Sequence, residues 1–136
     1  MTVEFSAQPR VFVQHFAPTR RSVRLAHRLA IHQLGMWGHS PGSPLCAVAG
    51  AMVHELAAFA VFSGPGVGRG FQLRLRQPGL AGALRIEVRD ARGDFRQPPW
   101  TRGRGLQLVV ARAKVWGFTD QRGVGRTFWA ELEEIE

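Results

Sequence analysis

The chain has 136 residues, of which 45% are hydrophobic and 21% charged, a balance that fits one folded domain and excludes a disordered chain. The formal net charge is +8, and 17 of the 18 cationic residues are arginine. This preference for arginine, together with abundant alanine and glycine, is typical of a GC-rich coding sequence. The positive charge is therefore weak evidence for nucleic-acid binding. The chain has a single cysteine, Cys46, so an internal disulfide is excluded. We expect no leader sequence, and we therefore expect the protein in the cytoplasm.

The first part of the chain predicts one strand followed by two helices. Alternating side chains over residues 11–16 indicate the strand, and Pro18 and Thr19 then begin a helix that runs to Met36. Apolar residues keep one face of this helix, namely Val23, Ala26, Leu29, Ala30 and Leu34. Another face carries three arginines, Arg21, Arg24 and Arg28. The helix is therefore predicted to be amphipathic and basic.

A second helix is predicted over residues 45–62, after a loop rich in glycine, serine and proline. Its 18 residues could cross a membrane by length alone. The adjacent pair His54 and Glu55 lies near its middle, however, and a carboxylate there would cost about 2.5–3.5 kcal/mol in a bilayer. We therefore expect the buried central helix of a soluble protein and no membrane contact.

The rest of the chain predicts four strands and a third helix. We first expect a hairpin of two strands, over residues 71–76 and 84–90, followed by a long loop to Arg102. A helix is then expected from the glycines at 103 and 105 to Trp116. Two strands, over 117–121 and 126–133, end the predicted order. The length of the chain indicates one domain over residues 1–136. The predicted fold is α/β of the α+β kind: a two-layer sandwich in which a mixed, mostly antiparallel sheet carries about three helices on one face.

Four segments of the chain carry a resemblance to a known family. They are HELAAFAV at 54–61, LRIEVRD at 84–90, GRGLQLVVARAKVWG at 103–117 and GRTFWAEL at 125–132. In order and spacing they resemble the Bergerat-type ATP-binding domain of the gyrase, Hsp90, histidine kinase and MutL superfamily, and within it the anti-sigma-factor serine kinases. The resemblance covers residues 16–132, nearly the whole chain, and implies that this range is the core of the domain. It also implies a bacterial regulator with a nucleotide-binding fold.

The resemblance assigns a role to Glu55, the carboxylate in the apolar helix. In that family this glutamate acts as, or supports, the general base of phosphoryl transfer, and an asparagine one turn later helps to hold magnesium. Glu55 matches the first position, but Phe59 occupies the second, and a phenyl ring supplies no oxygen ligand. The resemblance therefore implies a remnant base without a magnesium site. From the residues alone, Glu55 is a buried structural carboxylate with a partner.

The same resemblance assigns nucleotide contacts to the second half of the chain. Asp90 matches the aspartate that accepts a hydrogen bond from adenine, and Gly93 is the nearest match to the glycine that follows it. Gly103 and Gly105 match glycines that bring backbone N–H groups to the phosphates, and Thr127 matches the threonine behind the adenine-binding aspartate. The alternative interpretation makes Asp90 a turn residue and the glycines ordinary loop residues.

The sequence is compatible with three functions. The favoured function is that of an anti-sigma-type regulator, which binds a sigma factor or an anti-anti-sigma protein. Such a protein would bind ATP or ADP weakly and without magnesium. The resemblance also implies that it can form a homodimer. Its partner surface is expected to include Arg21, Arg24, Arg28 and Trp100, although an arginine stripe is most often only a solvated face. The alternatives are an active serine kinase of the same family and a basic nucleic-acid-binding module, for which no reading helix or stacking motif is apparent.

Overall fold

The computed structural model describes residues 10–62, 70–78, 82–90, 106–121 and 125–133. Within these ranges five strands and three helices follow one another in the predicted order. They are β1 (Arg10–Phe16), α1 (Arg20–Met36), α2 (Pro44–Phe62), β2 (Phe71–Gln77), β3 (Leu84–Asp90), α3 (Gln107–Arg112), β4 (Val115–Gln121) and β5 (Gly125–Leu132).

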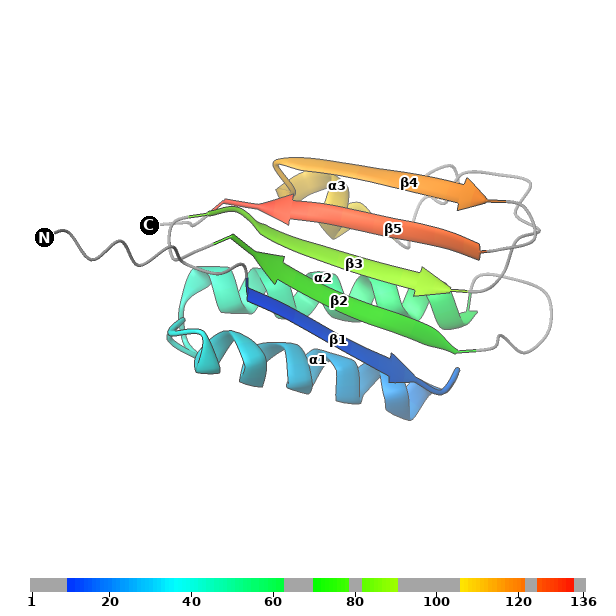
Figure 1. Ribbon diagram of the computed structural model, residues 1–136, viewed down its shortest axis with the longest axis horizontal. Helices are drawn as coiled ribbons and strands as arrows, with labels where there is room; N and C mark the ends of the chain where they lie inside the picture. The colour runs from blue at the N-terminus through cyan, green and yellow to red at the C-terminus, as the bar shows by residue number, and fades with distance from the viewer. Residues whose placement is uncertain (1–9, 63–69, 79–81, 91–105, 122–124, 134–136) are drawn as a thin grey trace, which may run out of the picture.

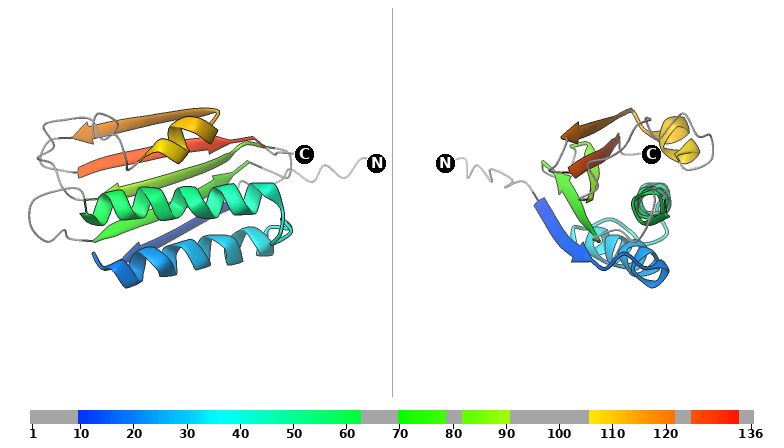
Figure 2. Two further views of the ribbon diagram at one scale, coloured as in Figure 1. Left: turned by 180° about the vertical axis from the view of Figure 1, so that it is seen from behind. Right: turned by 90° about the vertical axis from the view of Figure 1, so that its right-hand side faces the viewer.

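The strands form one sheet in the order β1-β2-β3-β5-β4, and each neighbouring pair is antiparallel. The three helices cover one face of this sheet, with α2 between α1 and α3 (Figures 1 and 2). The predicted two-layer sandwich of the α+β kind is thus confirmed. Its sheet is antiparallel in every described pair, so the mixed component of the prediction is not found in this part of the chain.

Helix α1 presents one apolar face to the core and its arginines to solvent. Thr19 caps its first turn, because its side-chain oxygen accepts a hydrogen bond from the backbone N–H of Ser22 at 3.0 Å. The buried face consists of Val23, Ala26, Ala30 and Leu34. The three arginines predicted on the polar face are all exposed, namely Arg21, Arg24 and Arg28.

Helix α2 is the centre of the core and is buried on most of its sides. Its buried residues are Leu45, Cys46, Ala49, Gly50, Met52, Val53, Leu56, Ala57, Ala60 and Val61. Among the described residues, α2 is also the one helix long and apolar enough to cross a membrane, with a mean hydropathy of 1.9, yet half of it is buried in the fold. This burial fits the predicted core helix of a soluble protein.

The third helix is shorter than the sequence predicted, and this part of the prediction was wrong. Helix α3 begins at Gln107 and ends at Arg112, whereas Trp116 belongs to β4. Ala113 is already extended, and the backbone N–H of Lys114 donates to the carbonyl of Glu131 in β5 at 2.8 Å. Valine and aromatic side chains at 115–118 favour a strand, and pairing with β5 satisfies that preference.

Gly70 and Gly38 offer a test of how closely the chain packs where β2 begins. Both have positive φ, +95° and +99°, but a Cβ on Gly70 would lie 2.4 Å from the backbone oxygen of Phe16, whereas a Cβ on Gly38 would meet nothing within 4 Å. We expect Gly38→Ala to lower the free energy of unfolding by about 1 kcal/mol, the cost of the left-handed backbone alone. Gly70→Ala should cost about 1–3 kcal/mol more, because a backbone atom must move. Urea unfolding of the two variants measures the difference, and equal losses would contradict the close approach.

Candidate functional site

The carboxylate of Glu55 holds the first turn of α3. Its Oε2 accepts a hydrogen bond from the backbone N–H of Leu108 at 3.2 Å, and its Oε1 accepts one from Val109 at 3.1 Å. The residue before α3, Leu106, makes no side-chain capping bond of its own. Glu55 therefore supplies from α2 the acceptors that the first amides of a helix need.

The charge on Glu55 is only partly compensated by these bonds. Burial raises the pKa of the Glu55 carboxyl above its ordinary value, and the two backbone hydrogen bonds from Val109 and Leu108 lower it by a smaller amount. The net effect is a raised pKa. The residue thus has the partner that the structural interpretation of the sequence required, and both of its oxygens are engaged by main-chain amides.

Asp90, the predicted adenine-binding residue, forms a buried ion pair with Arg126. Asp90 ends β3 and lies directly opposite Arg126 of β5. The Nε of Arg126 donates to Oδ1 of Asp90 at 2.9 Å and to Oδ2 at 2.7 Å. Asp90 is 4% exposed and Arg126 is fully buried, so the carboxylate meets a cation of its own chain on the helix-covered face of the sheet.

Phe59, which was predicted to replace a magnesium-binding asparagine, forms an aromatic wall of this ion pair. Its ring meets that of Phe128 edge-on with centroids 5.0 Å apart. The guanidinium carbon of Arg126 lies 5.4 Å from the centroid of Phe59 and 5.0 Å from that of Phe128. Such cation–π contacts stabilise a buried guanidinium. Phe59, Phe128, Arg126 and Asp90 therefore pack as one cluster, one helical turn along α2 from Glu55.

Thr127 does not join this cluster. In the sheet it pairs with Arg89 of β3 and Thr119 of β4. Successive side chains of a strand point to opposite faces, so Thr127 lies on the face away from the helices, whereas Arg126 and Asp90 lie on the face toward them. Four other predicted site residues, Gly93, Trp100, Gly103 and Gly105, lie outside the described residues.

The predicted partner surface on α1 is separate from the Asp90–Arg126 pair. Helix α2 lies between α1 and α3 (Figure 2). Arg21, Arg24 and Arg28 are exposed on α1, whereas the carboxylate of Glu55 binds amides of α3. One contact that the sequence did not predict joins α1 to α2: the rings of His27 and His54 meet edge-on, 5.6 Å apart. Burial, and to a smaller extent the charge of His54, lowers the pKa of His27. The described residues contain no group of three or more potential metal ligands.

Arg126 is the residue of the candidate site that the sequence did not single out. Its strand alternates inward and outward side chains, and Arg126 shares the inward register with Phe128, Ala130 and Leu132. A cation at an inward position requires a buried anion, and Asp90 ends a strand with the same inward alternation. That combination was the available signal, but the register between β3 and β5 was needed to pair the two residues.

No family model matches this sequence. A comparison with curated protein sequences likewise found no match.

The ion pair predicts a large loss of stability when one partner is removed. Asp90→Asn should lower the free energy of unfolding by about 3–5 kcal/mol, because it leaves a buried guanidinium without its anion. Replacing both residues, with Asp90→Leu and Arg126→Met, should recover most of that loss, since no charge is then buried. Urea unfolding of the parent and both variants measures these values. A stable Asp90→Asn protein would contradict a structural role for the pair.

Removing the Glu55 side chain should loosen α3. Glu55→Ala leaves two amides without their acceptors and should cost about 1–3 kcal/mol of unfolding free energy. Urea unfolding of the parent and the variant measures this cost.

The contribution of Glu55 to stability should also depend on pH, with a definite sign. Because the folded-state pKa of Glu55 is raised, the folded chain binds its proton more tightly than the unfolded chain does. The stability of the parent relative to Glu55→Gln should therefore fall as pH rises through the folded-state pKa. Urea unfolding across a pH series measures this, and a difference that rises with pH would contradict it.

Proposed function

We propose that the protein is a regulator of the anti-sigma-factor type, built on a Bergerat-type ATP-binding fold, that acts by binding a protein partner and not by phosphoryl transfer. The observation that carries the proposal is the ion pair of Asp90 with Arg126. In the family that the sequence resembles, this aspartate reads adenine. Here both of its oxygens accept from the buried Arg126, so a purine amino group would have to share the carboxylate with a guanidinium.

The groups that would handle phosphate and metal support the same proposal. Glu55 directs both oxygens at the amides of α3, which removes it from the position of a base free to accept a substrate proton. Phe59 packs on Phe128, and an aromatic ring cannot replace the oxygen ligand that magnesium requires. Phosphoryl transfer depends mainly on electrostatic positioning by the metal and nearby donors. A chain without these groups would retain the shape of the fold and lose most of the catalytic rate.

The basic face of α1 is the partner surface in this proposal. Arg21, Arg24 and Arg28 are exposed on a helix whose opposite face is anchored in the core. Arginine binds carboxylates in a bidentate manner, so an acidic surface of a sigma factor or of an anti-anti-sigma protein is the matching chemistry. A regulator of this kind would work in the cytoplasm, as a monomer or as a homodimer.

Affinity capture from native cell extract, with and without ATP and magnesium, tests this function. The parent should retain one transcription-regulating protein equally well under both conditions, and Arg24→Glu with Arg28→Glu should abolish its capture. A matched control, Arg89→Glu with Arg112→Glu, makes the same change in charge at exposed positions on other elements and should retain it.

Two results would overturn the proposal. One is an affinity for ATP that rises tenfold or more with magnesium, about 1.4 kcal/mol, in calorimetry of the purified protein. The other is phosphorylation of the captured partner by the parent protein. Either result would favour the active kinase.

A further inference from the structure

The face of the sheet that points away from the helices, here called the outer face, carries rows of paired side chains. One row runs from Val11 in β1 through Arg76, Arg85 and Glu131 to Val115 in β4. The next row runs through Val13, Arg74, Glu87, Trp129 and Gly117. Figure 2 shows the helices on the opposite side of the sheet. Among the described residues, no helix covers these rows.

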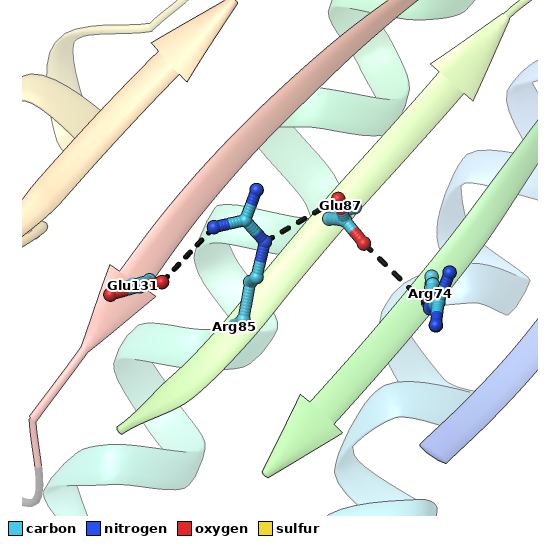
Figure 3. Close-up of polar contacts among 4 residues, drawn as sticks. All are labelled: Arg74, Arg85, Glu87 and Glu131. Atoms are coloured by element: carbon cyan, nitrogen blue, oxygen red, sulfur yellow. Dashed lines mark hydrogen bonds and ion pairs between the residues drawn. The ribbon is translucent and has the colours of Figure 1, made fainter. Parts of the chain in front are cut away.

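Two carboxylates in these rows are engaged by two of the arginines. Glu87 lies 3.7 Å from the Nε of Arg74 through Oε2 and 3.4 Å from the Nε of Arg85 through Oε1. Arg85 also donates from Nη1 to Oε1 of Glu131 at 3.0 Å (Figure 3). The network therefore runs Arg74–Glu87–Arg85–Glu131 across three strands. Both carboxylates are used within it.

Trp129 holds Arg85 in place from the same face. The guanidinium carbon of Arg85 lies 4.2 Å from the centroid of the Trp129 ring, a close cation–π contact. The indole in turn lies against Gly117, because a Cβ on that glycine would be 2.4 Å from Cζ2 of Trp129. Arg85 is thus fixed by two carboxylates and an indole.

Arg76 stands beside this network without an acidic partner in the described ranges. It is exposed and lies directly opposite Arg85, and like charges in that position are unfavourable. Its neighbour on the other side is the apolar Val11. An open hollow of about 420 Å³ lies here, lined by the arginines and glutamates of the network, by Arg76, and by Pro78 and Ala83 where β2 ends and β3 begins. The hollow therefore contains one positive charge that the surrounding residues do not balance.

We propose that this outer-face hollow binds an extended acidic peptide segment of a protein partner, with a carboxylate of the segment on Arg76. Charge complementarity argues for that occupant, because a carboxylate between Arg76 and Arg85 would relieve the opposition of two like charges. Val11 and Val13, 45% and 46% exposed, extend the surface along β1 and would take the apolar side chains of the same segment. The site lies on the other layer of the molecule from α1 and does not depend on the regulator proposal.

A peptide fits the hollow better than a nucleic acid does. Glu87 and Glu131 line it, and they would repel a continuous run of phosphates while tolerating a single carboxylate placed on Arg76. Single strands also need open aromatic faces on which bases stack. The one aromatic side chain of these two rows, Trp129, already has Arg85 over its ring.

Fluorescence anisotropy with a labelled probe peptide tests the site. The probe alternates glutamate with leucine over about eight residues, enough to cross the sheet in extended form, given a strand spacing of about 4.8 Å. It is compared with a glutamine–leucine peptide and with a single-stranded DNA of similar length, at an ionic strength of about 0.15 M. The acidic peptide should bind the full-length protein and the other two should not.

The decisive comparison is between two single arginine variants. Arg76→Gln should weaken binding of the acidic peptide about tenfold, equivalent to about 1.4 kcal/mol. Arg89→Gln removes the same charge from an exposed position on the same face, beyond the hollow, and should change affinity less than about twofold, or about 0.4 kcal/mol. Both side chains are exposed, and circular dichroism checks that both variants fold.

Four outcomes would overturn the proposal. These are equal effects of the two variants, no binding of the acidic peptide, equal binding of the glutamine peptide, and tighter binding of the DNA with the same dependence on Arg76. Sedimentation of the parent and of Arg76→Glu adds a fifth: a dimer that dissociates in the variant would make a second copy of the chain the occupant.

Discussion

The burial of α2 is the constraint on which the rest of the structure depends. A helix that is apolar on most of its sides must be covered on most of its sides, and here the sheet, α1 and α3 provide the cover. The small residues of α2 make this packing close: a Cβ on Gly50 would lie 2.9 Å from Nε2 of His27 in α1. On the other side of α2 the short helix α3 is held by hydrogen bonds that its backbone amides donate to the carboxylate of Glu55. A six-residue helix has little stability of its own, so its position depends on that contact and on the burial of Val109.

The Asp90–Arg126 pair shows what a buried charge requires in such a core. Desolvation makes an isolated ion in the interior unfavourable, and the pair is tolerated because each charge has the other and the guanidinium also lies beside two rings. Replacing two such residues by apolar ones is often neutral for stability, so an ion pair at this place is no evidence of selection for stability. The pair occupies both oxygens of the Asp90 carboxylate, and the regulator proposal rests on that observation.

The two layers divide the surface into areas of different chemistry. The α1 side offers three exposed arginines on one helix, Arg21, Arg24 and Arg28. The outer face of the sheet offers two arginines that carboxylates engage, Arg74 and Arg85, and Arg85 also lies over an indole. Two further arginines of this face, Arg76 and Arg89, are exposed and have no acidic partner in the described ranges. Among the described residues, the cations of the helix face are therefore solvated, whereas those of the sheet face are partly compensated. A net charge as high as +8 attracts acidic partners at a distance, while the local pairing decides which of them fit.

The sequence by itself determined the order and type of the elements, the two-layer class, the burial of α2 and the exposure of the α1 arginines. These properties follow from local periodicity, caps and turns, which short windows of sequence contain. It also indicated that Glu55 needs a partner, because a carboxylate in an apolar helix is unfavourable without one. Only the tertiary structure decided which partner: the amides of α3, more than 50 residues away along the chain. The pairing of Asp90 with Arg126, the opposite placement of Thr127, and the end of α3 before Trp116 depended on the register of β3 and β4 against β5. That register arises from contacts between distant segments, and a shift of one residue would turn every side chain to the other face, so no local pattern could specify it.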